Sequence, residues 1–495
     1  MNSKTVIKNA IFGFGGQFLI TLLGIVVPWV VIKSYGSDVN GLLNTVTQIF
    51  TYMALLEAGI GSATRNALYK PFAEKNKGEI SHIASASQSY FRRVSVVYIA
   101  GVILLAVVSP YVIISDIDNT TVSLVVLFHG LSGALSFYFI QTKLIILRIE
   151  GKGYVINSVT LVHTLISYTL KIVLAYYAID IVILQISYFL VALIQTFFYS
   201  FYFKKHYAWI SLKPSKDKSV LKDRNAYVIT EIAWTIFSAT DLIVLSTFVS
   251  TKMASVYSVY NMVFINLSGI LNSIFVSTNY ILGRTYHENI EKYKTLHDTF
   301  NSVYFGAITI LMSCCYVLTL PFVSLYTDGV NDINYIYSEL PLMFCLVQLI
   351  SWSRYISGNL TSVAGLAKQT SYVSLVEAII NVFLSVILVR RYGISGVLFA
   401  TVIALPIKVI YCTYVTERKV LRRSLKKTIT ILGTNALLFI VVVITSRYIP
   451  ISINSFGEFI LKGALVFVVF SAVGILINYI INPSCINIVK SLKKR

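Results

Sequence analysis

Apolar segments of about 20 residues recur from one end of the chain to the other, separated by short polar stretches. A helix of that length crosses the hydrocarbon core of a bilayer. The pattern predicts an all-α polytopic membrane protein with about 14 transmembrane helices. The predicted spans cover residues 10–32, 42–60, 94–114, 121–147, 154–178, 181–203, 226–249, 254–282, 302–326, 336–358, 371–389, 394–415, 428–449 and 457–481.

The second predicted span, 42–60, carries a stripe of polar side chains. It follows a polar turn at 35–41 and leaves through a small-residue hinge at 58–62. The stripe consists of Asn44, Thr47, Gln48, Thr51, Ser62 and Arg65. At about 100° per residue these positions fall on one broad helical face. Because unpaired polar groups in hydrocarbon cost several kcal/mol, roughly, we expect the stripe to face other helices or a watery cavity.

The second half of the chain repeats the first. A shift of 213 positions places the first two spans on the seventh and eighth, and Gln48 on Asn261. A second polar stripe then follows on the eighth span: Asn261, Ser268, Asn272 and Asn279. Both halves start on the same side of the membrane, so the repeat is parallel, and transporters place a substrate path between such halves.

The repeat predicts a division of the chain into two six-helix lobes. The segments are an N-lobe at 1–203, a basic cytoplasmic linker at 204–225, a C-lobe at 226–415, a basic cytoplasmic loop at 416–427, and two extra helices with a basic tail at 428–495.

The charge pattern predicts the orientation. Only 13% of residues are charged, 56% are hydrophobic, and the mean hydropathy is +0.75. The net charge of +20 comes from cations that gather in the loops of one side, so both termini are expected in the cytoplasm. In such loops the cations set topology, and nucleic acid is not expected as a partner. The five cysteines show neither metal spacing nor a disulfide framework.

Ionisable residues within spans are costly and are therefore functional candidates. Glu57, Glu231 and Asp241 are candidates for coupling to Na⁺ or H⁺. Arg65 and Arg354 lie near the inner ends of their spans, where planar guanidinium donors suit phosphate. The alternatives are pairing with an opposite charge, a position at the interface, or a topological role. No further cofactor and no metal site are expected.

Several segments together carry a resemblance to a known family. They are YGSDVNGL at 35–42, LLEAGIGSATRNALYKP at 55–71, SGNLTSVAGLAKQ at 357–369 and RRYGISGVLFAT at 390–401. In order, length and turns the chain resembles the Wzx-like polysaccharide repeat-unit flippases of the multidrug/oligosaccharidyl-lipid/polysaccharide (MOP) exporter superfamily.

The resemblance implies a MATE-like fold of two lobes around a central cavity that works by alternating access. The implied substrate is an undecaprenyl-pyrophosphate-linked oligosaccharide, moved from the inner to the outer leaflet of a bacterial plasma membrane for capsule or exopolysaccharide synthesis. Arg65, Arg354 and Arg284 would hold the pyrophosphate, and Asn44, Gln48, Asn261 and Asn272 would line the path. Other polysaccharide-assembly proteins are possible partners.

Other functions fit parts of the sequence. A cation-coupled multidrug exporter of the same superfamily is compatible with the intramembrane carboxylates. A polysaccharide polymerase or acyltransferase usually needs a large outer loop, and no predicted outer connection is long. A scaffold for polysaccharide assembly would not require intramembrane charges. The sequence therefore favours a flippase that is not an enzyme.

Overall fold

The computed structural model describes residues 3–212, 225–448 and 451–484, and side chains from residue 19 onward except 225–230 and positions 234, 273, 276, 277 and 280. All secondary structure in these ranges is helical. Ten of the described helices are long and apolar enough to cross a membrane. The part of the first helix whose side chains are described, Leu19–Tyr35, is a shorter apolar segment. The predicted all-α membrane architecture is confirmed.

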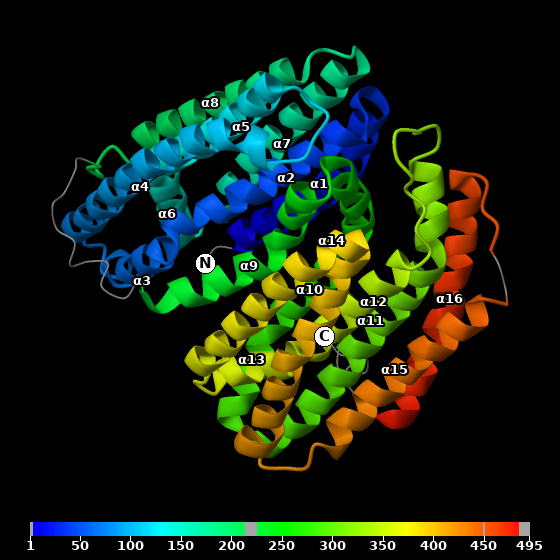
Figure 1. The fold of residues 1–495 in the computed structure, drawn as a ribbon. Helices are drawn as coiled ribbons and strands as arrows, with labels where there is room; N and C mark the ends of the chain where they lie inside the picture. The colour runs from blue at the N-terminus through cyan, green and yellow to red at the C-terminus, as the bar shows by residue number, and fades with distance from the viewer. Residues whose placement is uncertain (1–2, 213–224, 449–450, 485–495) are drawn as a thin grey trace. The chain divides into compact units, whose positions relative to one another are not determined.

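The chain divides into two compact units, Met1–Ser255 and Val256–Arg495. The first contains α1 (Ser3–Tyr35), α2 (Ser37–Met53), η1 (Ala54–Glu57), α3 (Ile60–Ala73), α4 (Lys77–Val112), α5 (Asn119–Leu135), η2 (Ser136–Ile140), α6 (Gln141–Ile149), α7 (Gly153–Tyr176), α8 (Ile181–His206) and α9 (Asn225–Phe248). Within this unit α5 packs between α4 and α8, and α7 packs between α8 and α1 (Figure 1).

The second unit begins inside the long helix α10. Its elements are α10 (Thr251–Glu288), α11 (Ile290–Tyr326), α12 (Leu340–Ser353), α13 (Tyr355–Val363), α14 (Ala367–Tyr414), η4 (Val415–Val420), α15 (Lys426–Ser446) and α16 (Phe456–Ile481). The last two helices pack on α11 and on each other (Figure 1). Most of the predicted linker, 213–224, lies outside the described residues, and the assignment of α9 to the C-lobe stays a prediction.

The predicted repeat is confirmed by the helix boundaries. The starts of α4 and α11 lie 213 positions apart, and so do the ends of α1 and α9. The same shift relates the N-caps Asn76 and Asn289. Each amide oxygen accepts a hydrogen bond from a backbone N–H three residues later, at 3.1 and 2.9 Å. The two halves therefore start corresponding helices with the same local chemistry.

The second predicted span differs from expectation at both ends. The predicted polar turn at 35–41 is mostly helical, because α2 starts at Ser37 and Gly36 makes the turn with φ 87° and ψ 175°. That conformation suits glycine, which has no Cβ. At the other end the α-helix stops at Met53, continues as η1, and turns at Gly59, with φ 75°, into α3. The repeat partner α10 runs through the corresponding region as one helix of 38 residues.

One other predicted span also contains a break. The region 336–358 divides into α12 and α13 at Arg354. The predicted spans 371–389 and 394–415 are two helical segments of α14 that meet at Gly393, where φ is 54° and ψ is −131°. The break in 336–358 thus coincides with a residue that the sequence marks as a functional candidate.

Candidate functional site

Helix α2 and helix α9 meet along a polar seam within the first unit. Asn40 donates a hydrogen bond to Ser255 Oγ at 2.7 Å, at the start of α10. Further along, Thr45 pairs with Ser246 and Tyr52 with Thr240. The charge of Asp241 acts on the Tyr52 hydroxyl, so this predicted coupling residue lies beside the seam.

The predicted stripe on α2 lies outside the pairs of this seam. The hydroxyls of Thr47 and Thr51 are exposed and donate back to their own helix, to carbonyls four residues earlier at 2.8 and 3.0 Å. Asn44 donates to the Asn40 carbonyl at 2.8 Å, and Gln48 is half-buried. This face of α2 is therefore polar and accessible, as a surface that contacts a hydrated ligand must be.

Three predicted residues come together where α2 gives way to α3. Glu57 ends η1, and the Gly59 N–H after it donates to Glu231 Oε2 of α9 at 3.0 Å. Arg65, one turn into α3, donates from Nη2 to Ser62 Oγ at 2.9 Å. The charges of Glu231 and Arg65 both act on the half-buried Glu57 carboxyl.

Arg148 of α6 completes this group, since its charge also acts on Glu57. We call Glu57, Arg65, Arg148 and Glu231 the hinge cluster. In the sequence Arg148 belongs to a run of cations assigned only to topology, and spacing gives no signal that α6 approaches η1. The cluster holds two carboxylates and two guanidiniums, so its charges balance, and an oxygen anion that binds the guanidiniums must compete with Glu57 and Glu231.

The predicted stripe on α10 faces α12 and α13 in the second unit. Ser268 donates to Gln348 Oε1 at 2.7 Å, and the Tyr355 hydroxyl donates to Asn272 Oδ1 at 3.5 Å. Seven residues after Asn272 on α10, Asn279 accepts a hydrogen bond from Asn359 of α13. Asn272 is exposed and Asn261 is half-buried. The stripe is thus partly engaged by neighbouring helices, and Asn272 keeps an accessible amide.

Arg354 does not lie open to solvent. It is 8% exposed, at the break between α12 and α13, and its guanidinium forms an ion pair with Glu377 of α14, which is 3% exposed. Lys408 of the same α14 also acts on the Glu377 carboxyl. The three charges leave an excess of one positive charge, but an anion that binds Arg354 must compete with Glu377.

Arg284 lies on the surface of α10. It is exposed and forms an ion pair with Glu288 one turn later, with an Nε–Oε1 distance of 2.6 Å. Such exposed pairs contribute little to stability. The contacts of Arg284 fit the topological alternative, and its role in pyrophosphate binding stays a prediction.

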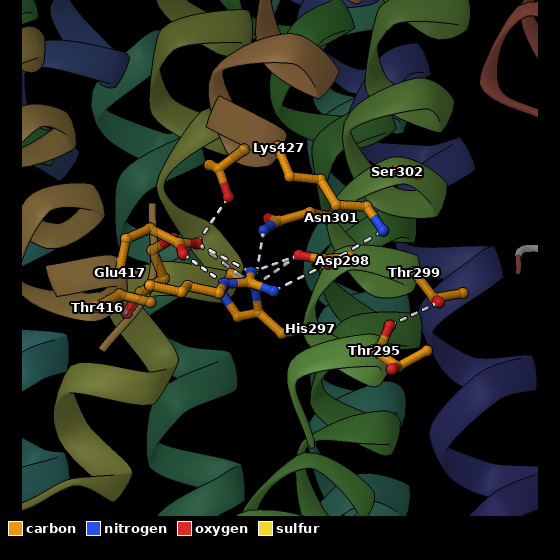
Figure 2. A network of polar contacts seen from close by, with 12 residues as sticks. Thr295, His297, Asp298, Thr299, Asn301, Ser302, Thr416, Glu417 and Lys427 are labelled. Atoms are coloured by element: carbon orange, nitrogen blue, oxygen red, sulfur yellow. Dashed lines mark hydrogen bonds and ion pairs between the residues drawn. The ribbon is translucent and has the colours of Figure 1, made fainter. Parts of the chain in front are cut away.

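A buried charge network at the start of α11 was not anticipated. Arg423 donates to Glu417 Oε2 at 2.6 Å and to Asp298 Oδ2 at 2.9 Å, while Lys427 approaches Asp298 at 3.3 Å (Figure 2). Both carboxylates are almost fully buried. Burial by itself lowers the pKa of the Arg423 guanidinium, but its hydrogen bonds to Glu417 and Asp298 outweigh burial and raise it. Two cations of the predicted basic loop therefore join α15 to α11.

His297 lies inside the same network and is fully buried. Its Nδ1 is approached by donors from Arg423 and Asn301, each at 3.3 Å (Figure 2). The same Nδ1 lies 3.6 Å from Asp298 Oδ1 and 3.9 Å from Glu417 Oε1, so the imidazole is surrounded by the charged groups of the network.

An apolar groove lies in the second unit, between α11 and α16. Its volume is about 800 Å³. Its lining is mostly apolar and includes Val303 and Leu311 on α11 and Phe467 and Leu476 on α16. Such a lining suits a hydrocarbon chain.

Comparisons by sequence identify no relative. No protein-family model matches the chain, and no curated protein matches it.

Comparisons by structure are informative about the fold. A structure described as lipid II flippase MurJ in an inward closed conformation matches with a TM-score of 0.69 at 16% identity, over 94% of this chain and 98% of that one. An inward-facing MATE family multidrug resistance transporter of the MOP superfamily matches with a TM-score of 0.65 at 14% identity, over 86% and 96%. The MATE transporter DinF-BH matches with a TM-score of 0.61 at 14% identity, over 85% and 97%. The chain has the MOP transporter fold, as the sequence predicted.

Proposed function

We propose that the protein is a flippase that moves an undecaprenyl-pyrophosphate-linked oligosaccharide from the inner to the outer leaflet of a bacterial plasma membrane. It does so by alternating access and serves capsule or exopolysaccharide synthesis. The observation that carries the proposal is the extent of the structural match: the lipid flippase match covers 94% of the chain and the MATE transporter matches cover 85–88%. The match therefore extends over more of the chain for a lipid carrier than for the drug exporters.

The chemistry of the described residues supports a substrate with a polar head and a long tail. Carrying a charged glycan through hydrocarbon without polar contacts is prohibitively costly. In the first unit, the accessible amides and hydroxyls of α2 can replace part of the water around a sugar, and in the second unit the exposed Asn272 amide can do the same. The hinge cluster provides two guanidiniums for a pyrophosphate. The α11–α16 groove accommodates hydrocarbon.

Transport against a gradient requires an ion that moves with or against the substrate. Glu57, Glu231 and Asp241 are the proposed carriers of H⁺ or ligands of Na⁺, with both termini in the cytoplasm. The first two lie in the hinge cluster, so ion binding there would change the charge that the two arginines offer to the substrate.

The test is to deplete the protein in its host and determine which leaflet holds the polyprenyl-linked oligosaccharides. The expected result is accumulation of single repeat units on the cytoplasmic face. Complementation with Arg65→Ala or Arg148→Ala should restore outer-leaflet delivery at least tenfold less well than wild type. Arg418→Ala is the matched control, because Arg418 is exposed on η4.

Normal delivery of the oligosaccharide, together with new sensitivity to cationic drugs, would instead establish the multidrug exporter. If all three arginine variants complement equally well, the hinge cluster does not bind the substrate. The depletion experiment alone would then decide whether the protein is a flippase.

A further inference from the structure

The interior of the first unit contains a ridge of polar side chains that the transport path does not use. On α7, His163, Ser167 and Lys171 recur every four residues and so share one face. On α8, Gln185 and Tyr188 lie three residues apart on one face. The two faces meet at Tyr188, whose ring centroid is 5.2 Å from Lys171 Nζ and 6.0 Å from the His163 ring.

Two further helices close this region. The ring of His129 on α5 stacks on Tyr188 with a centroid distance of 5.6 Å. Phe50 on α2 stacks on the other face of His129 at 5.4 Å. The ammonium group of Lys171 therefore lies against the Tyr188 ring, where α5, α7 and α8 meet, and α2 contacts His129.

Two buried side chains on these faces of α7 and α8 have unused hydrogen-bonding groups. Ser167 is 3% exposed and Gln185 is 1% exposed. Among the residues that the structure describes, neither the Ser167 hydroxyl nor either polar atom of the Gln185 amide has a hydrogen-bond partner. Buried polar atoms without partners are costly, so native proteins normally satisfy them, often with a bound group.

The lysine also has no carboxylate to pair with. Helices α1, α5, α7 and α8 contain no aspartate or glutamate anywhere along their lengths. The one carboxylate of α2, Asp38, accepts hydrogen bonds from Ser115, Thr251 and the Asp116 N–H. Glu57 belongs to the hinge cluster. The contact with the Tyr188 ring compensates the ammonium charge only in part.

We propose that Lys171, Ser167 and Gln185 bind a small monovalent inorganic anion of halide size. Lys171 supplies the counter-charge, and the Ser167 hydroxyl and the Gln185 amide N–H donate to the anion. The site lies away from the hinge cluster and does not depend on the proposed flippase activity.

The experiment uses the purified full-length protein in detergent. Thermal unfolding is followed in sodium chloride and in sodium gluconate at equal ionic strength, because gluconate is too large for the site. The expected result is a midpoint that rises by a few degrees with chloride and increases with the logarithm of chloride concentration. Lys171→Met should abolish the rise, and Gln185→Leu should reduce it.

Lys143→Met is the matched control. Lys143 is a buried lysine of the same unit whose ammonium group already donates to Ser200 Oγ at 2.8 Å, so its loss should leave the response to chloride intact. If Lys171→Met cannot be purified, Gln185→Leu and Lys171→Arg provide the comparison, and Lys171→Arg should retain the response.

Bromide-soaked crystals provide a direct readout, with an anomalous peak expected between Lys171 and Gln185. An equal midpoint in chloride and gluconate, together with no such peak, would overturn the proposal and indicate a deprotonated lysine. A chloride response that survives in Lys171→Met would also overturn it, since the anion would then bind elsewhere.

Discussion

At the scale of residues, the most informative difference from expectation is Arg354. An arginine inside an apolar segment suggests a substrate contact, because its burial is otherwise costly. Its ion pair with Glu377 provides another explanation, since both partners are buried and each compensates the other. Replacing one partner of a buried ion pair lowers the free energy of unfolding far more than replacing both partners with apolar residues. The reason is that the single replacement leaves the other charge unpaired in a medium of low dielectric constant.

This reasoning predicts that Arg354→Met lowers the free energy of unfolding by about 3–5 kcal/mol. The double variant Arg354→Met/Glu377→Leu should recover most of that loss. Thermal unfolding in detergent measures both. If the single and double variants are equally unstable, the pair is not the reason for the burial of Arg354, and its contribution to substrate binding gains weight.

At the scale of elements, a buried charge network helps to join the last two helices to α11. Glu417 in η4 and Asp298 in α11 have almost no exposure, and Arg423 bridges them. Thr428, in the first turn of α15, also donates to Glu417 at 2.7 Å. Further along the two helices, Asn435 of α15 and Asn478 of α16 exchange hydrogen bonds at 3.0 and 2.9 Å. The last two helices are thus bound to α11 by specific polar contacts.

Arg423→Met should therefore destabilise the protein by about 3 kcal/mol or more, because two buried carboxylates lose their shared partner. The neighbouring change Arg418→Met should cost less than about 0.5 kcal/mol, since Arg418 is exposed. Limited proteolysis between α14 and α15 should accelerate only in Arg423→Met. Equal behaviour of the two variants would contradict a structural role for the network.

At the scale of the whole molecule, the repeat is expressed in helix boundaries and caps. Asn76 and Asn289 occupy corresponding N-cap positions and make the same hydrogen bond. The helices that they start have 36 and 37 residues. What differs between the copies is the break after α2, which is absent from α10. The hinge cluster therefore belongs to one copy only.

The repeat predicts that Asn76→Ala and Asn289→Ala each destabilise the protein by about 1 kcal/mol. The double variant should show the sum, because the two caps lie in separate units and share no partner. Replacing each asparagine with aspartate should preserve stability. A loss at only one position would show that the caps are not equivalent.

The sequence by itself determined the membrane-spanning pattern, the repeat and the polar stripes. Hydrophobic segment length and the cost of unpaired polar groups act locally, so they can be read from periodicity. The break near Gly59 was also anticipated, since small residues cluster there. The Wzx-like flippase assignment rests on turn sequences and stays a proposal.

Tertiary structure alone decided which charges meet. Arg148 joins Glu57, Glu377 pairs with Arg354, and Arg423 bridges Asp298 and Glu417. The Arg354–Glu377 and Arg423–Asp298 pairs join residues 23 and 125 positions apart, and no periodicity encodes such separations. The physical reason is that a buried charge is stabilised by whatever packing places beside it, which depends on the angles and registers of helices and not on spacing along the chain.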